Sequence, residues 1–148
     1  MSMDIHVCWR GTFAPTRGAL AEALKKVGFE ATVLHDFLEE EGYWPIDIEG
    51  VKTGVEVYPN EDLADLRDIY PTYAEAAGSR DRGVTFTFHS DPMEGAVAVA
   101  LAAAITQLCD AVIYEPSEGV VYSPQRAIEE ARKDFERAKT EGYTPRDG

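Results

Sequence analysis

Apolar and polar residues alternate in several short stretches of this chain, and the alternation predicts β-strands. Ile5, Val7 and Trp9 alternate with His6 and Cys8 near the N-terminus. The stretch G-V-T-F-T-F-H at 83–89 is the clearest, because its apolar residues fall on one face and its threonines on the other. Similar patterns predict further strands at 31–37, 54–58, 111–114 and 120–122, with a short extended piece at 46–48.

Apolar residues spaced three and four apart predict helices between these strands. The predicted helices follow Thr16, Asn60, Asp91 and Ser123, residue types that cap helix N-termini. The helix at 93–108 is apolar nearly all round (A-V-A-V-A-L-A-A-A-I), which predicts burial on more than one side. The segment 39–45 is predicted to be a loop, and 73–82 a polar connection.

Apart from the short helix after Asn60, this order contains a βαββαβ core. That order is typical of the split βαβ, ferredoxin-like layout. We therefore expect an α+β fold, with helices on one face of an antiparallel sheet and a C-terminal β-hairpin strand and helix added. The length of 148 residues suits one domain. We place that domain at 1–139, and we expect residues 140–148 to fray as a C-terminal tail.

The charge balance narrows the choice of partners. With 27 acidic and 14 basic residues, the chain has a formal net charge of −13. Such a field repels phosphate backbones and anionic membranes, so neither nucleic acid nor a membrane is an expected partner. It suits a basic protein partner, although acidity can also serve solubility alone. The N-terminus lacks the pattern of a signal peptide, and we expect a cytoplasmic protein.

Sequence motifs of catalysis and cofactor binding are absent. The chain has no P-loop, dinucleotide-binding, H-E-x-x-H or G-x-S-x-G motif, so we lean against an enzyme and expect no cofactor. His6, His35 and His89 each fall in a predicted strand. If those strands are neighbours, the histidines form a zinc site or a catalytic site on a polar sheet face. The alternative is that the three lie scattered, each with its own hydrogen bond.

Aromatic and acidic residues occur together in the predicted loops and in the helix after Asn60. Tyrosine and tryptophan are common interface anchors, and carboxylates around them steer a basic partner. The candidate partner-binding residues are Glu39, Glu40, Glu41, Tyr43, Trp44, Asp47, Glu49, Asp62, Asp65, Asp68 and Tyr70. The alternative is that Trp44 and Tyr70 pack on the core and that the glutamate run is a solvated loop.

The last third of the chain carries a family resemblance. Its sequence reads A-V-A-V-A-L-A-A-A-I-T-Q-L-C-D-A-V-I-Y-E-P-S-E-G-V-V-Y-S-P-Q-R-A-I-E-E-A-R. This order of an Ala-rich helix, a short strand, an acidic turn and a helix beginning Ser-Pro resembles small bacterial proteins encoded beside polymorphic toxins. The resemblance implies a toxin-immunity protein that occludes one cognate toxin without catalysis. The toxin-facing surface varies among such proteins, so it assigns no functional residues.

These observations favour an acidic, immunity-type binding protein whose carboxylates pair with a basic site on the toxin. Two other hypotheses stay open. One is a small-ligand or metal-binding enzyme that uses the three histidines. The other is a regulatory homodimer formed by sheet-edge pairing.

Overall fold

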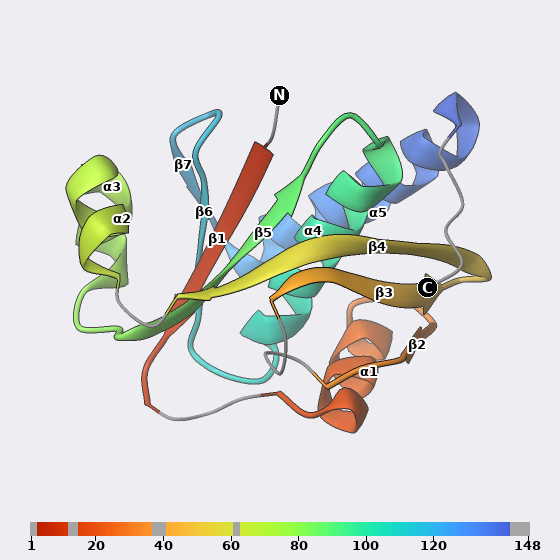
Figure 1. The fold of residues 1–148 in the computed structure, drawn as a ribbon, viewed down its shortest axis with the longest axis horizontal. Helices are drawn as coiled ribbons and strands as arrows, with labels where there is room; N and C mark the ends of the chain where they lie inside the picture. Colours follow the sequence, from red (N-terminus) through yellow and green to blue (C-terminus); the bar gives the residue numbers. More distant parts are fainter. Residues whose placement is uncertain (1–2, 12–14, 37–40, 61–62, 143–148) are drawn as a thin grey trace.

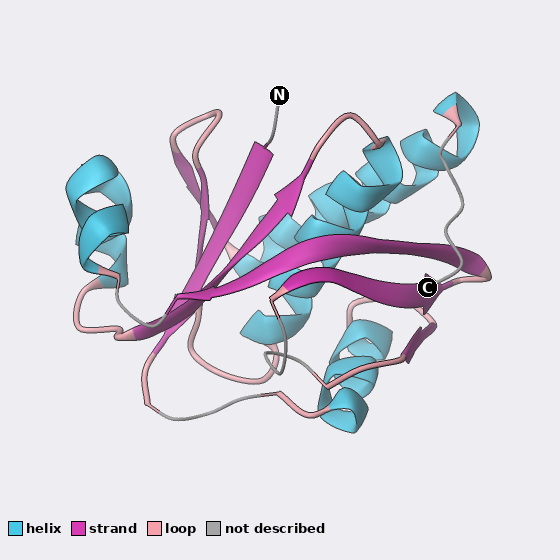
Figure 2. Cartoon of the chain, viewed as in Figure 1, coloured by secondary structure: helices cyan, strands magenta, loops and turns pink. Residues whose placement is uncertain are grey.

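A single antiparallel sheet organises the part of the chain that the computed structural model describes, residues 3–11, 15–36, 41–60 and 63–142 (Figure 1, Figure 2). The strands are β1 (Met3–Trp9), β2 (Ala31–Val33), β3 (Gly42–Ile48), β4 (Val51–Asn60), β5 (Arg82–Phe88), β6 (Val112–Glu115) and β7 (Val120–Tyr122). The helices are α1 (Arg17–Lys26), α2 (Ala64–Ile69), α3 (Pro71–Ala77), α4 (Pro92–Thr106) and α5 (Pro124–Glu141). The strand order is β2-β3-β4-β5-β1-β6-β7, so the α+β class is confirmed.

The strand order differs from the predicted ferredoxin-like layout. Every neighbouring pair is antiparallel, so β1 and β2 run in the same direction with three strands between them. A split βαβ unit needs only one strand between its parallel pair. That arrangement occurs later in the chain, where β5 and β6 flank β1 and α4 connects them. The β3–β4 hairpin causes the difference, because it inserts two strands between β2 and β5.

The prediction of a loop at 39–45 was wrong for residues 42–45, whereas Glu41 lies outside the strand as predicted. Gly42 to Pro45 extend β3 and pair with β4, from Gly42 opposite Val57 to Pro45 opposite Gly54. Pro45 is tolerated because β2 pairs with β3 only from Ile46 onward, and no strand needs the missing N–H. Strand β2 ends at Val33, opposite Ile46, and not at 37 as predicted, because the next residue of β3 is Pro45, which has no N–H for pairing.

The helix predicted after Asn60 becomes two short helices. Asn60 is the last residue of β4, and α2 begins only at Ala64. Pro71 ends α2 as predicted, but it also occupies the first turn of α3, where its fixed φ suits a new helix. The segment from Tyr73, predicted as a polar connection, therefore begins inside α3. The sequence feature that indicates α3 is the pair Tyr73 and Ala77, which are four residues apart. In the structure both side chains are buried.

The main core lies between one face of the sheet and the helices α1, α4 and α5 (Figure 1). Every residue of α4 from Met93 to Ile105 is buried, as the apolar sequence predicted. Helix α4 packs on α5 and α1 and on the strands β1, β4 and β5. No helix in the described part of the chain is long and apolar enough to cross a membrane.

Three of the predicted helix caps are confirmed. The Thr16 side chain accepts a hydrogen bond from the Ala19 N–H at 3.2 Å, and Asp91 accepts from Met93 at 2.9 Å. Ser123 accepts from the Arg126 N–H at 3.1 Å. These bonds satisfy N–H groups that have no partner inside the helix. The described end of α5, at Glu141, lies beyond the predicted start of the frayed tail at 140, and residues 143–148 lie outside the described residues.

A second, smaller core occupies the opposite face of the sheet, so the helices do not all cover one face as predicted. Helices α2 and α3 pack here through Leu63, Tyr73 and Ala77 against Cys8 of β1 and Tyr114 of β6. Two arginines hold this helical segment in place, one at the end of α3 and one beside the start of β6. Arg67 donates to the Gly78 carbonyl at 2.8 Å, and Arg80 forms an ion pair with Asp110 at 2.8 Å.

Gly54 lies in a closely packed part of the β3–β4 hairpin, so its substitution is a test of that packing. A Cβ at this position would lie 2.5 Å from Cζ of Tyr43 and 2.6 Å from the Trp44 carbonyl oxygen. We expect Gly54→Ala to lower the free energy of unfolding by about 1–3 kcal/mol, because backbone must shift to admit the methyl group. Gly18→Ala is the matched control, since no atom lies within 4 Å and alanine favours the helix. Urea unfolding of both variants would refute this packing if Gly54→Ala were as stable as Gly18→Ala.

Candidate functional site

The outer face of β3, β4 and β5 is the candidate functional surface, because no helix among the described residues covers it. Helices α2 and α3 pack on the β1–β6 side of this face, while α1, α4 and α5 lie on the other face. We call the uncovered surface the open sheet face. Its residues are Asp4, Tyr43, Asp47, Lys52, Glu56, Tyr58, Thr87 and His89.

Strand register brings four of these residues into one row across the sheet. Tyr43 lies opposite Glu56, Glu56 opposite Thr87, and Thr87 opposite Asp4. The Thr87 hydroxyl donates to Asp4 at 2.8 Å. Tyr43 leans toward Gly54, the next outward position on β4, and keeps 40% of its surface exposed. The row thus presents an aromatic ring and two carboxylates on a rigid sheet.

Glu56 is the centre of a hydrogen-bonded group on this face. Its Oε1 accepts from the Tyr58 hydroxyl at 2.5 Å, and its Oε2 lies 2.7 Å from Nε2 of His89. These partners, Tyr58 first, hold the pKa of the Glu56 carboxyl below its usual range. Glu56 therefore carries a negative charge at neutral pH, in a fixed orientation between an aromatic ring and an imidazole.

Three carboxylates surround the Tyr58 hydroxyl. Its hydrogen bond to Glu56 is the main cause that raises the pKa of Tyr58, and the charges of Glu41 and Asp4 raise it further. Glu41 is next to β3, and Asp4 comes from β1, so the three acids arrive from different strands. The field at this edge of the open sheet face is negative and attracts cationic groups.

A buried histidine lies where the open sheet face meets α2 and α3. His6 is 2% exposed, and its Nδ1 bonds the Thr85 hydroxyl at 2.8 Å. Its ring centroid lies 5.6 Å from that of Tyr70 and 5.9 Å from that of Tyr73. No described residue forms a hydrogen bond with Nε2 of His6. Burial lowers the pKa of His6, against a smaller opposing effect of Asp4, so the ring is neutral in the folded protein.

The predicted partner-binding residues divide into several groups. Glu39, Glu40 and Asp62 lie outside the described residues. Glu41, Tyr43 and Asp47 lie on or beside the open sheet face, while Asp65 and Asp68 are exposed on α2. Tyr70 is half-buried against His6 and Tyr114. Glu49 lies in the β3–β4 turn and forms an ion pair with Arg132 of α5 at 2.9 Å.

Trp44 is not an interface anchor in this structure. It is 4% exposed and belongs to the main core, because in a strand its side chain points away from those of Tyr43 and Pro45. The prediction that Trp44 anchors a partner was therefore wrong, and its packing alternative holds. Tyr43 keeps the exposure that an anchor needs.

The three histidines do not converge. His6 is buried beneath α2 and α3, whereas His89 follows β5 at the far end of the open sheet face. His35 follows β2, beyond the opposite edge of the sheet. No group of three or more His, Cys, Asp or Glu side chains that could hold a metal ion occurs within the described ranges. The hypothesis of a three-histidine zinc site was wrong: His6 lies opposite Thr85, four residues before His89, and three strands separate β1 from β2, which precedes His35.

The sequence interpretation missed Asp4, Glu56 and Tyr58. The alternation at 54–58 placed Glu56 and Tyr58 on the polar face of a strand, but polar faces are common and carry no sign of function alone. Their interest comes from pairing with β1, β3 and β5, which lie far apart in the sequence. Comparisons of the chain with protein-family models, with curated proteins and with solved structures found no match.

His6 predicts a specific pH dependence of stability. Because burial lowers its pKa in the folded state, the unfolded chain binds a proton more readily below about pH 6.5. We expect the free energy of unfolding to fall by up to about 1.4 kcal/mol per pH unit as the pH drops from 6.5 toward the folded pKa. The His6→Gln variant, measured by urea unfolding between pH 5.5 and 7.5, loses this slope. The exposed His35→Gln variant keeps it, and equal slopes in both variants would exclude His6 as the cause.

Proposed function

We propose that this chain is a protein-binding module that docks a basic partner on its open sheet face. The observation that carries the proposal is the uncovered surface itself. This face, which no helix of the described ranges covers, presents Tyr43 and Tyr58 among the carboxylates of Asp4, Asp47 and Glu56. Tyrosine provides contact area at low cost in conformational entropy, and carboxylates around it favour a cationic surface.

Charge complementarity supports a basic partner. The net charge of −13 steers a positively charged protein toward this chain and repels acidic competitors. Glu56 is held in one orientation by Tyr58 and His89, so little side-chain entropy is lost when a lysine or arginine of the partner reaches it. Among the described residues of the open sheet face, Lys52 is the one lysine or arginine beside three carboxylates, Asp4, Asp47 and Glu56, so the face keeps an excess of negative charge.

We further propose that the partner is a bacterial toxin and that the chain is an immunity-type inhibitor. This step relies on the resemblance of the last third of the chain. The mechanism is occlusion: the rigid face covers a basic site of the toxin, and its carboxylates occupy the place of an anionic substrate. Such a mechanism requires no catalytic residue in this chain.

One observation favours a second candidate, an enzyme that acts by general acid–base chemistry. A carboxylate at 2.7 Å from an imidazole nitrogen orients the ring, as in catalytic histidine–carboxylate pairs. The side chain of His89 is 55% exposed, so a small molecule can reach its other nitrogen. His89→Ala removes this chemistry but leaves Tyr43 and Asp47 in place. Partner binding that survives His89→Ala supports the first candidate, whereas loss of a catalytic activity in this variant supports the second.

The first test is partner binding by charge-reversed variants. Affinity capture at low salt identifies a basic, stoichiometric partner, and binding is then measured with purified proteins. We expect Glu41→Lys with Asp47→Lys to weaken binding at least tenfold and to reduce its salt dependence, because both charges lie on or beside the open sheet face. Tyr43→Ala weakens binding by about tenfold through loss of an anchor.

The matched control is Glu22→Lys with Glu75→Lys, which changes the net charge equally on α1 and α3. Both glutamates are exposed and lie outside the open sheet face. The control pair keeps nearly full affinity if the open sheet face is the docking site. Equal losses in the two double variants would show that only the net charge matters and would refute the proposed surface.

Neutralisation is tested separately from binding. Coexpression with the captured partner in a sensitive host protects the cells if the chain is an immunity-type inhibitor, and the Glu41→Lys, Asp47→Lys variant fails to protect. Tight binding to a partner that is harmless to cells would retain the binding module and reject the immunity role.

A further inference from the structure

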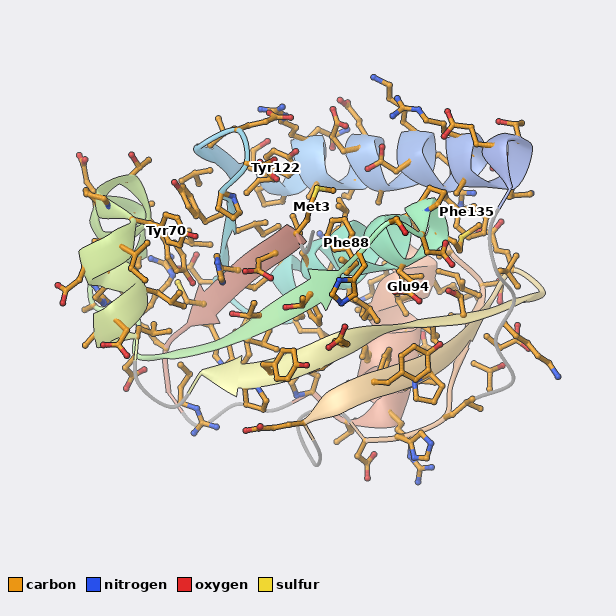
Figure 3. The ribbon with its side chains drawn as sticks, turned by 45° about the horizontal axis from the view of Figure 1, so that its top comes forward. Met3, Tyr70, Phe88, Glu94, Tyr122 and Phe135 are labelled. Atoms are coloured by element: carbon orange, nitrogen blue, oxygen red, sulfur yellow. The ribbon has the colours of Figure 1, made fainter. Side chains whose placement is uncertain are left out.

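A groove on a different part of the surface has the size of a small-molecule site. It lies between the ends of β1 and β5, the start of α4, the β6–β7 turn and one side of α5, and it has a volume of about 560 Å³. Figure 3 shows Met3, Phe88 and Tyr122 around it, with α5 alongside. Sites for small ligands are typically about 300–1,000 Å³. Of the open sheet face, only His89 also lines this groove.

The floor of the groove is apolar. It is formed by Met3 and Ile5 of β1, Phe88 of β5, and Ala96 and Val99 of α4. Met3 is 37% exposed, which is unusual for a large apolar side chain of this protein. A hydrocarbon segment laid on this floor would leave water and gain free energy.

The rim of the groove is acidic. Six carboxylates line it, with Arg137 as its one lysine or arginine. Three of the six lie near Tyr122: Glu118, Glu115 and Glu130 raise its pKa, after burial, and Arg126 opposes them. Glu130 and Glu118 also raise the pKa of Asp134, which Arg137 opposes. Burial is the main cause of the raised pKa of Asp134, so this carboxyl is partly withdrawn from water. A cation bound beside it would offset that penalty.

The carboxylates on α5 are spaced along the groove. Glu130, Asp134 and Glu141 are separated by four and seven residues, which is about 6 Å and 10 Å along a helix. A flexible ligand with two cationic ends can therefore contact two of them while its middle lies on the apolar floor. The net negative charge of the lining disfavours an anion, and a neutral apolar ligand would make no use of that charge.

We propose that this groove binds a linear aliphatic diamine or polyamine, whose methylene chain lies on the floor and whose ammonium groups pair with two of the three α5 carboxylates Glu130, Asp134 and Glu141. The proposal goes beyond partner binding on the open sheet face and does not depend on it. The geometry that carries it is the combination of an apolar floor with carboxylates spaced along one wall.

The test is a titration of the full chain with 1,8-diaminooctane, followed through the methyl signals of ¹³C-labelled methionine. Met3 lines the groove, whereas Met93 is 0% exposed and serves as the internal control. We expect a saturable shift of the Met3 signal and none of the Met93 signal. Affinity rises with chain length from 1,3-diaminopropane to 1,8-diaminooctane, by up to about fourfold for each methylene buried.

Two double variants distinguish binding of the diamine in the groove from its nonspecific attraction to an acidic protein. Glu130→Gln with Asp134→Asn weakens the binding of 1,8-diaminooctane about tenfold, since two partly exposed charge pairs are lost. Glu22→Gln with Glu75→Gln removes the same charge from α1 and α3 and leaves the affinity unchanged. An unchanged Met93 signal and melting temperature show that each variant is folded.

Three results would overturn the proposal. They are equal losses in both double variants, an affinity that does not depend on chain length, and a similar shift of the Met3 signal caused by sodium chloride at the same ionic strength. The last two use the unaltered chain, so the proposal stays testable even if a variant fails to fold. Binding of 1-hexanol as tightly as of 1,6-diaminohexane would show a neutral apolar site and would also reject it.

Discussion

Burial of α4 on every side is the constraint on which the rest of this structure depends. From Met93 to Ile105 the helix has no polar face, so it needs protein neighbours in all directions. The sheet provides one side, and α5 and α1 provide the others. The many alanines of α4 allow these neighbours to approach closely. Three helices are thereby committed to one face of the sheet, and the other face must be stabilised by different means.

The other face of the sheet is covered by helices over β1 and β6 and is exposed over β3, β4 and β5. Over β1 and β6, two short helices bury an aromatic cluster in which Tyr73 and Tyr114 stack with ring centroids 5.3 Å apart. Over β3, β4 and β5, the outward residues are polar or small and bond one another, with Glu56 at the centre. His6 lies at the boundary, where burial opposes its protonation.

The elements predicted best from the sequence are those that local chemistry specifies. The β6–β7 hairpin and α5 have the predicted order because a turn, a Ser123 cap and an amphipathic stripe occur within one short stretch. The elements missed depend on contacts elsewhere. Gly42 to Pro45 form a strand because β4 pairs with them. Pro71 begins a helix because the side chain of Tyr73 is buried against β1 and β6. Trp44 is a residue type common in interface anchors, but the alternation of side chains along β3 points it into the main core.

By itself, the sequence determined the α+β class, the buried helix, three helix caps and the strong negative charge. These properties follow from residue types and from periods of two and about four residues, which act over short distances. Only the tertiary structure decided the strand order, the separation of the three histidines, and the grouping of Asp4, Glu56 and Tyr58 on one surface. Strand pairing joins residues far apart in the chain, such as Asp4 and Thr87, and no local pattern specifies which strands become neighbours.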